Sequence, residues 1–304
     1  LLRFPGAEGW LTAPLTVAHA VEVISPRLSL DFRPMFPSLW SFDSARVEGE
    51  VDLKNLLFRF DKAAVKVDNA TANASGEIYL ADKQAPKDLP FGLRLTASTN
   101  SIVKPEQVLR FWPVKLAHSA RKWVVENVKF GEFSDAEFRM NLKPDSLRDD
   151  VFDNEELQLE FSFKNAEVGF LSDLPPVKKG VGRGRLEGNR FSLDVESGEF
   201  SNWQISSGLV QIPRFKPDGE TLVVRATGSG NVRDIVKTLS NSRLQLEKQY
   251  GLNIDAISGT GTANFELKRP IQKNVPDDAT RFSVEGKVRD GGFKGLYGDL
   301  NLTK

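Results

Sequence analysis

The side chains that could catalyse a reaction are few and scattered along the chain. There are two histidines, His19 in a strand-like run and His118 beside Ser119 in a helical stretch. A serine hydrolase would need a nucleophile elbow of the form G-x-S-x-G, and the sequence contains none. Two isolated histidines in a chain without cysteine do not form the usual zinc site. We therefore predict that the protein is not an enzyme and that His118 is an ordinary residue of its helix.

Two further groups of residues match ligand-binding motifs only in part. Gly182-x-Gly184 and Gly228-x-Gly230 resemble phosphate loops, but neither completes such a motif, and glycines beside short strands more often mark turns or bulges. An acidic cluster lacks the spacing of a calcium loop, which favours a solvated turn. It consists of Asp149, Asp150, Asp153, Glu155 and Glu156. We predict no metal site and no cofactor.

Composition narrows the classes of partner. Lys plus Arg equals Asp plus Glu at 41 each, so nothing in the charge favours binding to nucleic acid. No uncharged apolar run reaches the roughly 18 residues needed to cross a membrane. The first ten residues, LLRFPGAEGW, have no initiating Met and no signal-peptide pattern. We expect residues 1–304 to be one continuous segment of a longer protein, with any anchor or export signal outside it.

Most of the chain alternates apolar and polar residues, which is the pattern of a sheet with one face hidden from water. Short turn clusters between the runs favour an antiparallel meander. A break with two prolines runs from Leu174 to Gly180. The main predicted strands are Val47–Leu53, Leu56–Phe60, Val65–Val67, Phe91–Ala97, Phe133–Leu142, Leu157–Phe163, Ala166–Phe170, Phe191–Val195, Phe200–Ile205, Leu222–Ala226, Ala263–Leu267 and Phe282–Val288.

Two stretches have helical periodicity instead. The first covers residues 105–126 and is interrupted at Pro113; the second covers 231–250, with Asn231 as its N-cap and Gly251 as its C-terminal stop. The sub-blocks are strands 1–103, helices 104–126, strands 127–230, a helix 231–251 and strands 252–304. This recurring plan indicates an elongated, repeat-built β structure.

The apolar side of the strands is rich in aromatic residues, with 21 Phe and five Trp in the chain. Two structures fit this alternation: a closed sandwich core, or an open trough that holds lipid tails. They differ in whether a second sheet covers the apolar face. The candidate lining residues of a trough come from the best-alternating strands and are Phe138, Met140, Leu142, Leu157, Leu159, Phe161, Phe163, Phe191, Leu193, Val195, Phe265 and Leu267.

Motifs in and after the two helical stretches carry a family resemblance. The first stretch has Phe111-Trp112-Pro113, then Ala120-Arg121-x-Trp123, Asn127 and Gly131. The second is followed by GTGTANFELKRPI at 259–271. These motifs cover about a third of the chain. They resemble the AsmA-like family of bacterial envelope proteins, in particular its YhdP branch.

The resemblance implies a mainly β fold, an elongated antiparallel sheet curled into a taco-like groove, with helical insertions near 105–126 and 231–250. It also implies the periplasmic portion of an inner-membrane-anchored protein of Gram-negative bacteria. There the groove would shield phospholipid acyl chains in a conduit between inner and outer membrane, and the expected partners are those lipids, membranes reached through other segments, and envelope proteins. The alternative is a structural or scaffolding envelope β protein with a closed core and protein partners.

Overall fold

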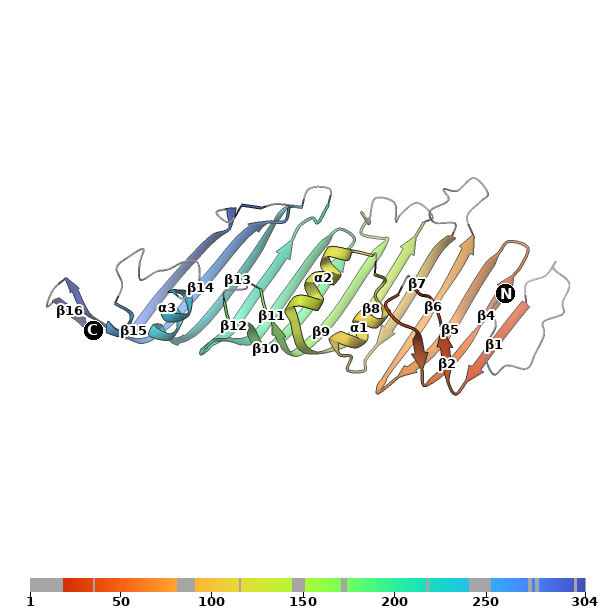
Figure 1. The fold of residues 1–304 in the computed structure, drawn as a ribbon, viewed down its shortest axis with the longest axis horizontal. Helices are drawn as coiled ribbons and strands as arrows, with labels where there is room; N and C mark the ends of the chain where they lie inside the picture. The colour runs from red at the N-terminus through yellow and green to blue at the C-terminus, as the bar shows by residue number, and fades with distance from the viewer. Residues whose placement is uncertain are drawn as a thin grey trace.

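One long antiparallel sheet makes up most of the molecule. The computed structural model describes residues 19–34, 36–80, 91–114, 116–143, 151–170, 174–216, 219–240, 253–272, 275–276, 279–297 and 300–303. Within these ranges fourteen strands form the sheet; β4 to β16 pair in chain order, and β1 pairs with β4 at the outer edge. The sheet is curled and unclosed, with β1 and β16 at opposite ends (Figure 1). This confirms the predicted fold class.

The strands are mostly long. In chain order they are β1 (His19–Ser25), β2 (Leu28–Leu30), β3 (Trp40–Phe42), β4 (Ser44–Asp52), β5 (Leu57–Val67), β6 (Ala70–Leu80), β7 (Phe91–Thr99), β8 (Val128–Leu142), β9 (Leu157–Val168), β10 (Val177–Glu187), β11 (Arg190–Phe200), β12 (Trp203–Ile212), β13 (Thr221–Asn231), β14 (Ile257–Pro270), β15 (Arg281–Tyr297) and β16 (Leu300–Thr303). β2 and β3 form a separate two-stranded hairpin.

Repeated β-bulges account for the curl. In β5, Asp61 is the extra residue between Phe60 and Ala63, and the pairing register with β4 and β6 shifts there. A bulge bends its strand and increases the local twist. Several register shifts in the later strands fall at similar sites, a polar pair followed by Ala or Gly. These are Ser134-Asp135-Ala136, Lys164-Asn165-Ala166, Lys178-Lys179-Gly180, Glu196-Ser197-Gly198, Ser206-Ser207-Gly208 and Arg289-Asp290-Gly291.

The bulges correct several predicted strand boundaries. The separate runs Leu56–Phe60 and Val65–Val67 belong to one strand, β5, and Leu157–Phe163 continues through its bulge into Val168. The apparent break in alternation came from the extra residue, which lets both halves of a strand keep their apolar residues on the same face. The predicted break at Leu174–Gly180 is also too long, because β10 begins at Val177.

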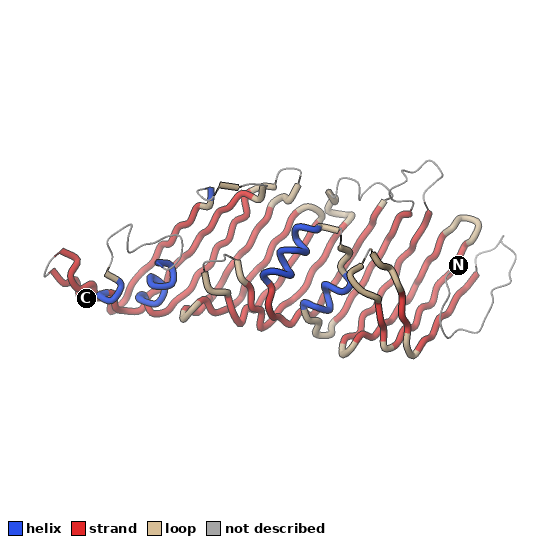
Figure 2. Tube along the Cα trace, viewed as in Figure 1, coloured by secondary structure: helices blue, strands red, loops and turns tan. Residues whose placement is uncertain are grey.

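Three α-helices of the described residues lie against one side of the sheet (Figure 2): α1 (Pro105–Phe111), α2 (His118–Asn127) and α3 (Val232–Ser240). A short 3-10 helix, η1 (Ile254–Ala256), precedes β14. Pro113 lies in the interruption between α1 and α2, as predicted. Asn231 precedes α3, and its Oδ1 accepts a hydrogen bond from the Arg233 N–H at 2.9 Å. The predicted continuation of this helix, from residue 241 to 250, lies outside the described residues. No helix in the described part of the chain has the length and apolarity to span a membrane.

Two buried clusters attach short elements to the same face. Phe111 at the end of α1 and Trp40 of β3 pack on a cluster made of Leu28, Phe42, Ala45 and Val67. Leu116, between α1 and α2, packs on a second cluster made of Met140, Leu142, Phe152 and Leu157. The α1–α2 segment is therefore held to the sheet at both of these points.

Candidate functional site

Cross-strand register places apolar residues in continuous rows. Partners in an antiparallel pair point to the same face, so pairing can be followed from strand to strand. Row 1 runs from β1 to β12, and all its members are apolar and half-buried. It consists of Val23, Val47, Ala63, Ala74, Ala97, Phe138, Leu159, Leu186, Phe191 and Ile212. We call the face that carries row 1 the apolar face and the opposite one the polar face.

Two more rows continue the apolar face to β15. Row 2 consists of Phe161, Gly184, Leu193, Val210, Val224, Leu267 and Phe282. Row 3 consists of Phe133, Phe163, Gly182, Val195, Gly208, Ala226, Phe265 and Val284. Rows 1, 2 and 3 overlap on β9, β10, β11 and β12, so the apolar face has no interruption between its two halves.

The structure brings the predicted lining residues onto one face. Phe138, Leu159 and Phe191 belong to row 1, Phe161, Leu193 and Leu267 to row 2, and Phe163, Val195 and Phe265 to row 3. The remaining three are Met140, Leu142 and Leu157. Met140 pairs with Leu95 on one side and with Leu157 on the other, and Leu142 pairs with Leu93. Their shared face follows from the register, while their contact with lipid stays a prediction.

The apolar face is open along much of its length. Among the described residues the only sheet besides the large one is the β2–β3 hairpin at one end. The protein exposes 20148 Å², whereas a compact protein of its 33.8 kDa mass would expose about 12,700 Å². In row 3 Val284 is 42% exposed. Row 1 is half-buried throughout, while Phe163 of row 3 and Leu267 of row 2 are buried, so this face is covered locally. Within the described residues no second sheet extends over it as it would over a sandwich core.

The α1–α2 segment lies across this face. Its two helices are joined by Arg121, whose Nε and Nη2 donate to the carbonyl oxygens of Trp112 and Leu109 at 3.4 and 3.3 Å. Gln107 Nε2 donates to Asp68 Oδ2 at 3.1 Å and ties α1 to the turn between β5 and β6. None of the residues of α2 is buried. α2 therefore lies over the sheet without burying an apolar face of its own against it.

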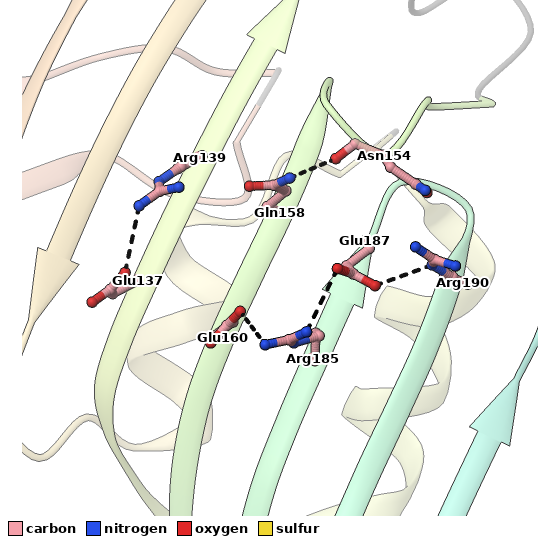
Figure 3. A network of polar contacts seen from close by, with 8 residues as sticks. All are labelled: Glu137, Arg139, Asn154, Gln158, Glu160, Arg185, Glu187 and Arg190. Atoms are coloured by element: carbon pink, nitrogen blue, oxygen red, sulfur yellow. Dashed lines mark hydrogen bonds and ion pairs between the residues drawn. The ribbon is translucent and has the colours of Figure 1, made fainter.

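Charged pairs cover the polar face. Figure 3 shows a network on β8 to β11 and the turns beside them, on the side away from the helices. Arg185 lies 2.8 Å from Glu160 and 3.7 Å from Glu187, and Arg190 also reaches Glu187 at 3.1 Å. On β14, hydrogen bonds from Lys268 and then Arg225 hold the pKa of the Glu266 carboxyl below its usual value. The Glu266 carboxylate therefore stays ionised at neutral pH.

These exposed pairs are expected to add little to stability. Arg185 and Glu160 have side chains that are 53% and 57% exposed, so water screens their attraction. Replacing Arg185 with Ala should lower the free energy of unfolding by less than about 1 kcal/mol, measured by urea denaturation. A loss of several kcal/mol would show that the polar face contributes to the fold more than its exposure indicates.

The residues of the partial ligand motifs are placed as follows in the described part of the chain. Within the described residues, no three side chains suited to a metal ion gather. The His118 ring is exposed, with Nδ1 3.3 Å from the Val114 carbonyl oxygen. In the acidic cluster, Glu156 is buried and accepts a hydrogen bond from the Asp153 N–H at 3.0 Å, while residues 149–150 lie outside the described residues. Two shallow hollows on the sheet are lined largely by polar side chains such as Arg225 and Glu285.

Sequence reasoning missed two features of the apolar face. Gly182 and Gly184 are not at a turn but inside β10, paired with Phe163 and Phe161. The expectation of a turn or bulge at these glycines holds for Gly182, which lies next to a register shift of β10. The bulges of the other strands were missed, although a polar pair followed by Ala or Gly recurs in the sequence at several of them. The glycine positions of β10 and the bulge residues can both be recognised once the strands are aligned by their pairing register.

Comparison with known proteins supplies one match. The sequence pattern of a family described as YhdP protein matches residues 17–290. No curated protein and no solved structure matches the chain.

Proposed function

Because this chain belongs to the YhdP family, we propose that it is a segment of a periplasm-spanning conduit that transfers phospholipid between the inner and outer membrane of a Gram-negative bacterium. In this proposal the apolar face holds the acyl tails and the polar face meets water. The protein acts by binding and guiding lipid, with no bond made or broken. It is the periplasmic portion of a protein anchored in the inner membrane by another segment.

The observation that carries the proposal is the continuity of the apolar rows. Row 1 passes from β1 to β12 without a charged side chain, and rows 2 and 3 continue to β15. Burial of each acyl CH₂ is worth about 0.8 kcal/mol, so a tail lying along these rows gains free energy over most of its length. Neighbouring positions in a row offer similar contacts, and a lipid can therefore advance without leaving one deep site.

The alternative is a scaffolding protein whose apolar face is covered by a partner protein. The half-buried residues of row 1 could be covered by a partner protein. The β2–β3 hairpin already packs on this face near β4 and β5. Continuity favours lipid, because a protein partner usually buries a bounded patch with a polar rim, not rows that extend along an entire sheet.

The first test is the lipid content of the purified chain. We expect phospholipid to co-purify and to be released by organic solvent, where mass spectrometry identifies it. Purification without detergent ensures that bound lipid comes from the cell. A preparation that is folded and free of phospholipid would contradict the proposal and favour the scaffolding alternative.

A further inference from the structure

Two glycines sit in the middle of the apolar face, where alternation calls for large side chains. Gly184 in β10 lies between Phe161 of β9 and Leu193 of β11, and Gly182 lies between Phe163 and Val195. The two positions belong to rows 2 and 3, in the part of the sheet where all three rows overlap. β10 is therefore a strand whose apolar-face side chains are partly missing.

Aromatic rings from β9 occupy the space above these glycines. A Cβ atom on Gly184 would overlap Cζ of Phe161, with Cε1 and Cε2 at 2.5 and 2.9 Å, and all three nearest atoms belong to that ring. Carbon atoms in contact normally lie about 3.5–4.0 Å apart. The ring of Phe161 thus lies across β10 instead of standing up from the sheet, and it is packed edge-on to Phe133 with ring centres 5.7 Å apart.

The same arrangement recurs on β13. There the indole of Trp203 covers Gly230, with its Cδ1, Cγ and Nε1 atoms 2.8, 2.9 and 3.0 Å from the position of an added Cβ. The indole N–H donates to the Asn231 carbonyl oxygen at 2.6 Å, which fixes the ring in this position. An aromatic ring that lies flat over a glycine therefore occurs twice on the apolar face, at Gly184 and at Gly230.

The position of the Phe161 ring affects the room for a lipid tail, because helix α2 crosses the apolar face in this region. α2 runs directly into β8, the strand next to β9, and lies over the middle of the sheet in Figure 1. A lipid tail that passes from row 1 to row 2 between β8 and β11 has the sheet on one side and this helix close by. The height of the Phe161 ring above the sheet then determines how much room a tail has.

We propose that Gly184 sets the clearance for acyl chains at the centre of the apolar face, by letting the Phe161 ring lie flat. This rests on the proposed function and assigns Gly184 and Phe161 as positioning residues for lipid passage. A methyl group on Gly184 would lift the ring into the path. The sheet itself would keep its pairing, since alanine is compatible with a strand at this position.

The test is a cross-strand rescue in the full-length protein. Gly184→Ala is expected to lower phospholipid transfer about tenfold, the effect of a local overpacking cost on a rate. Phe161→Leu, combined with Gly184→Ala, removes the ring and is expected to restore transfer. The matched control is Gly198→Ala on β11, because an added Cβ there would meet its nearest atoms at an ordinary 3.4–3.6 Å, and it should transfer lipid at the wild-type rate.

The outcomes separate this inference from the function it rests on. Wild-type transfer by Gly184→Ala, or failure of Phe161→Leu to rescue it, overturns the clearance role while leaving the conduit intact. Should Gly184→Ala reduce the amount of folded protein, Leu193→Phe serves instead, since it adds a ring on the other side of Gly184 and is also expected to slow transfer. If Leu193→Asp, described below, is likewise without effect, the conduit itself is wrong.

Discussion

Replacing Leu193 with Asp is expected to reduce phospholipid transfer by at least about a hundredfold. Leu193 lies in the middle of row 2, between Gly184 and Val210. A carboxylate at this position has to be desolvated whenever an acyl chain covers it, at a cost of several kcal/mol, and each 1.4 kcal/mol slows passage tenfold. Phe161→Asp should act in the same way. The measurement is lipid transfer by the full-length protein, together with phospholipid bound per chain by native mass spectrometry.

The control is the same substitution on the neighbouring residue. Ser192 precedes Leu193 and points to the opposite face, where it pairs with Arg185 and Gln211. Ser192→Asp adds an equal charge to β11 without placing it among the apolar rows, so transfer should remain at the wild-type level. Equal transfer by the Leu193 and Ser192 variants would show that the apolar face is not the lipid path.

Deleting Asp61 should destabilise the protein by about 3 kcal/mol or more. Asp61 is the extra residue of the β5 bulge, and without it the two halves of the strand fall out of phase. Either Phe58 and Phe60 or Val65 and Val67 must then leave the apolar face. Val67 is only 8% exposed and belongs to the cluster beneath the β2–β3 hairpin, so its loss also loosens that hairpin. Urea denaturation measures the effect.

Substitution at the same site distinguishes the backbone from the side chain. Asp61→Ser retains the extra residue, and because this position is exposed, the free energy of unfolding should change by no more than about 0.5 kcal/mol. A deletion variant with the same urea midpoint as Asp61→Ser would mean that the bulge does not set the phase of β5.

Much of the fold could be predicted from the sequence because a half-buried sheet imposes strict alternation. Runs such as Leu157–Phe163 identify both the strand and its apolar side, and the predicted lining residues accordingly share one face. Pro113 and Asn231 marked the helix interruption and the helix start for equally local reasons.

The features of the fold that could not be predicted depend on contacts between residues that are distant in the sequence. β10 shows little hydrophobic alternation, because Gly180, Gly182 and Gly184 carry no side chains and their apolar cover comes from β9. The short β2–β3 hairpin depends on packing against Phe111, which is distant in the sequence. Trp123 follows the helical apolar pattern yet is 45% exposed, because periodicity alone does not tell whether a partner surface is present.

The overlap of the three rows has a consequence for how cargo would travel. Row 1 ends at β12 and row 3 begins only at β8. The apolar part of this face therefore runs obliquely to the direction of the interstrand hydrogen bonds. A tail that keeps to apolar contacts has to move obliquely and pass from row 1 to rows 2 and 3 between β9 and β12. Each lipid would then shift along the strand direction as it advances, from one rim of the curled sheet toward the other.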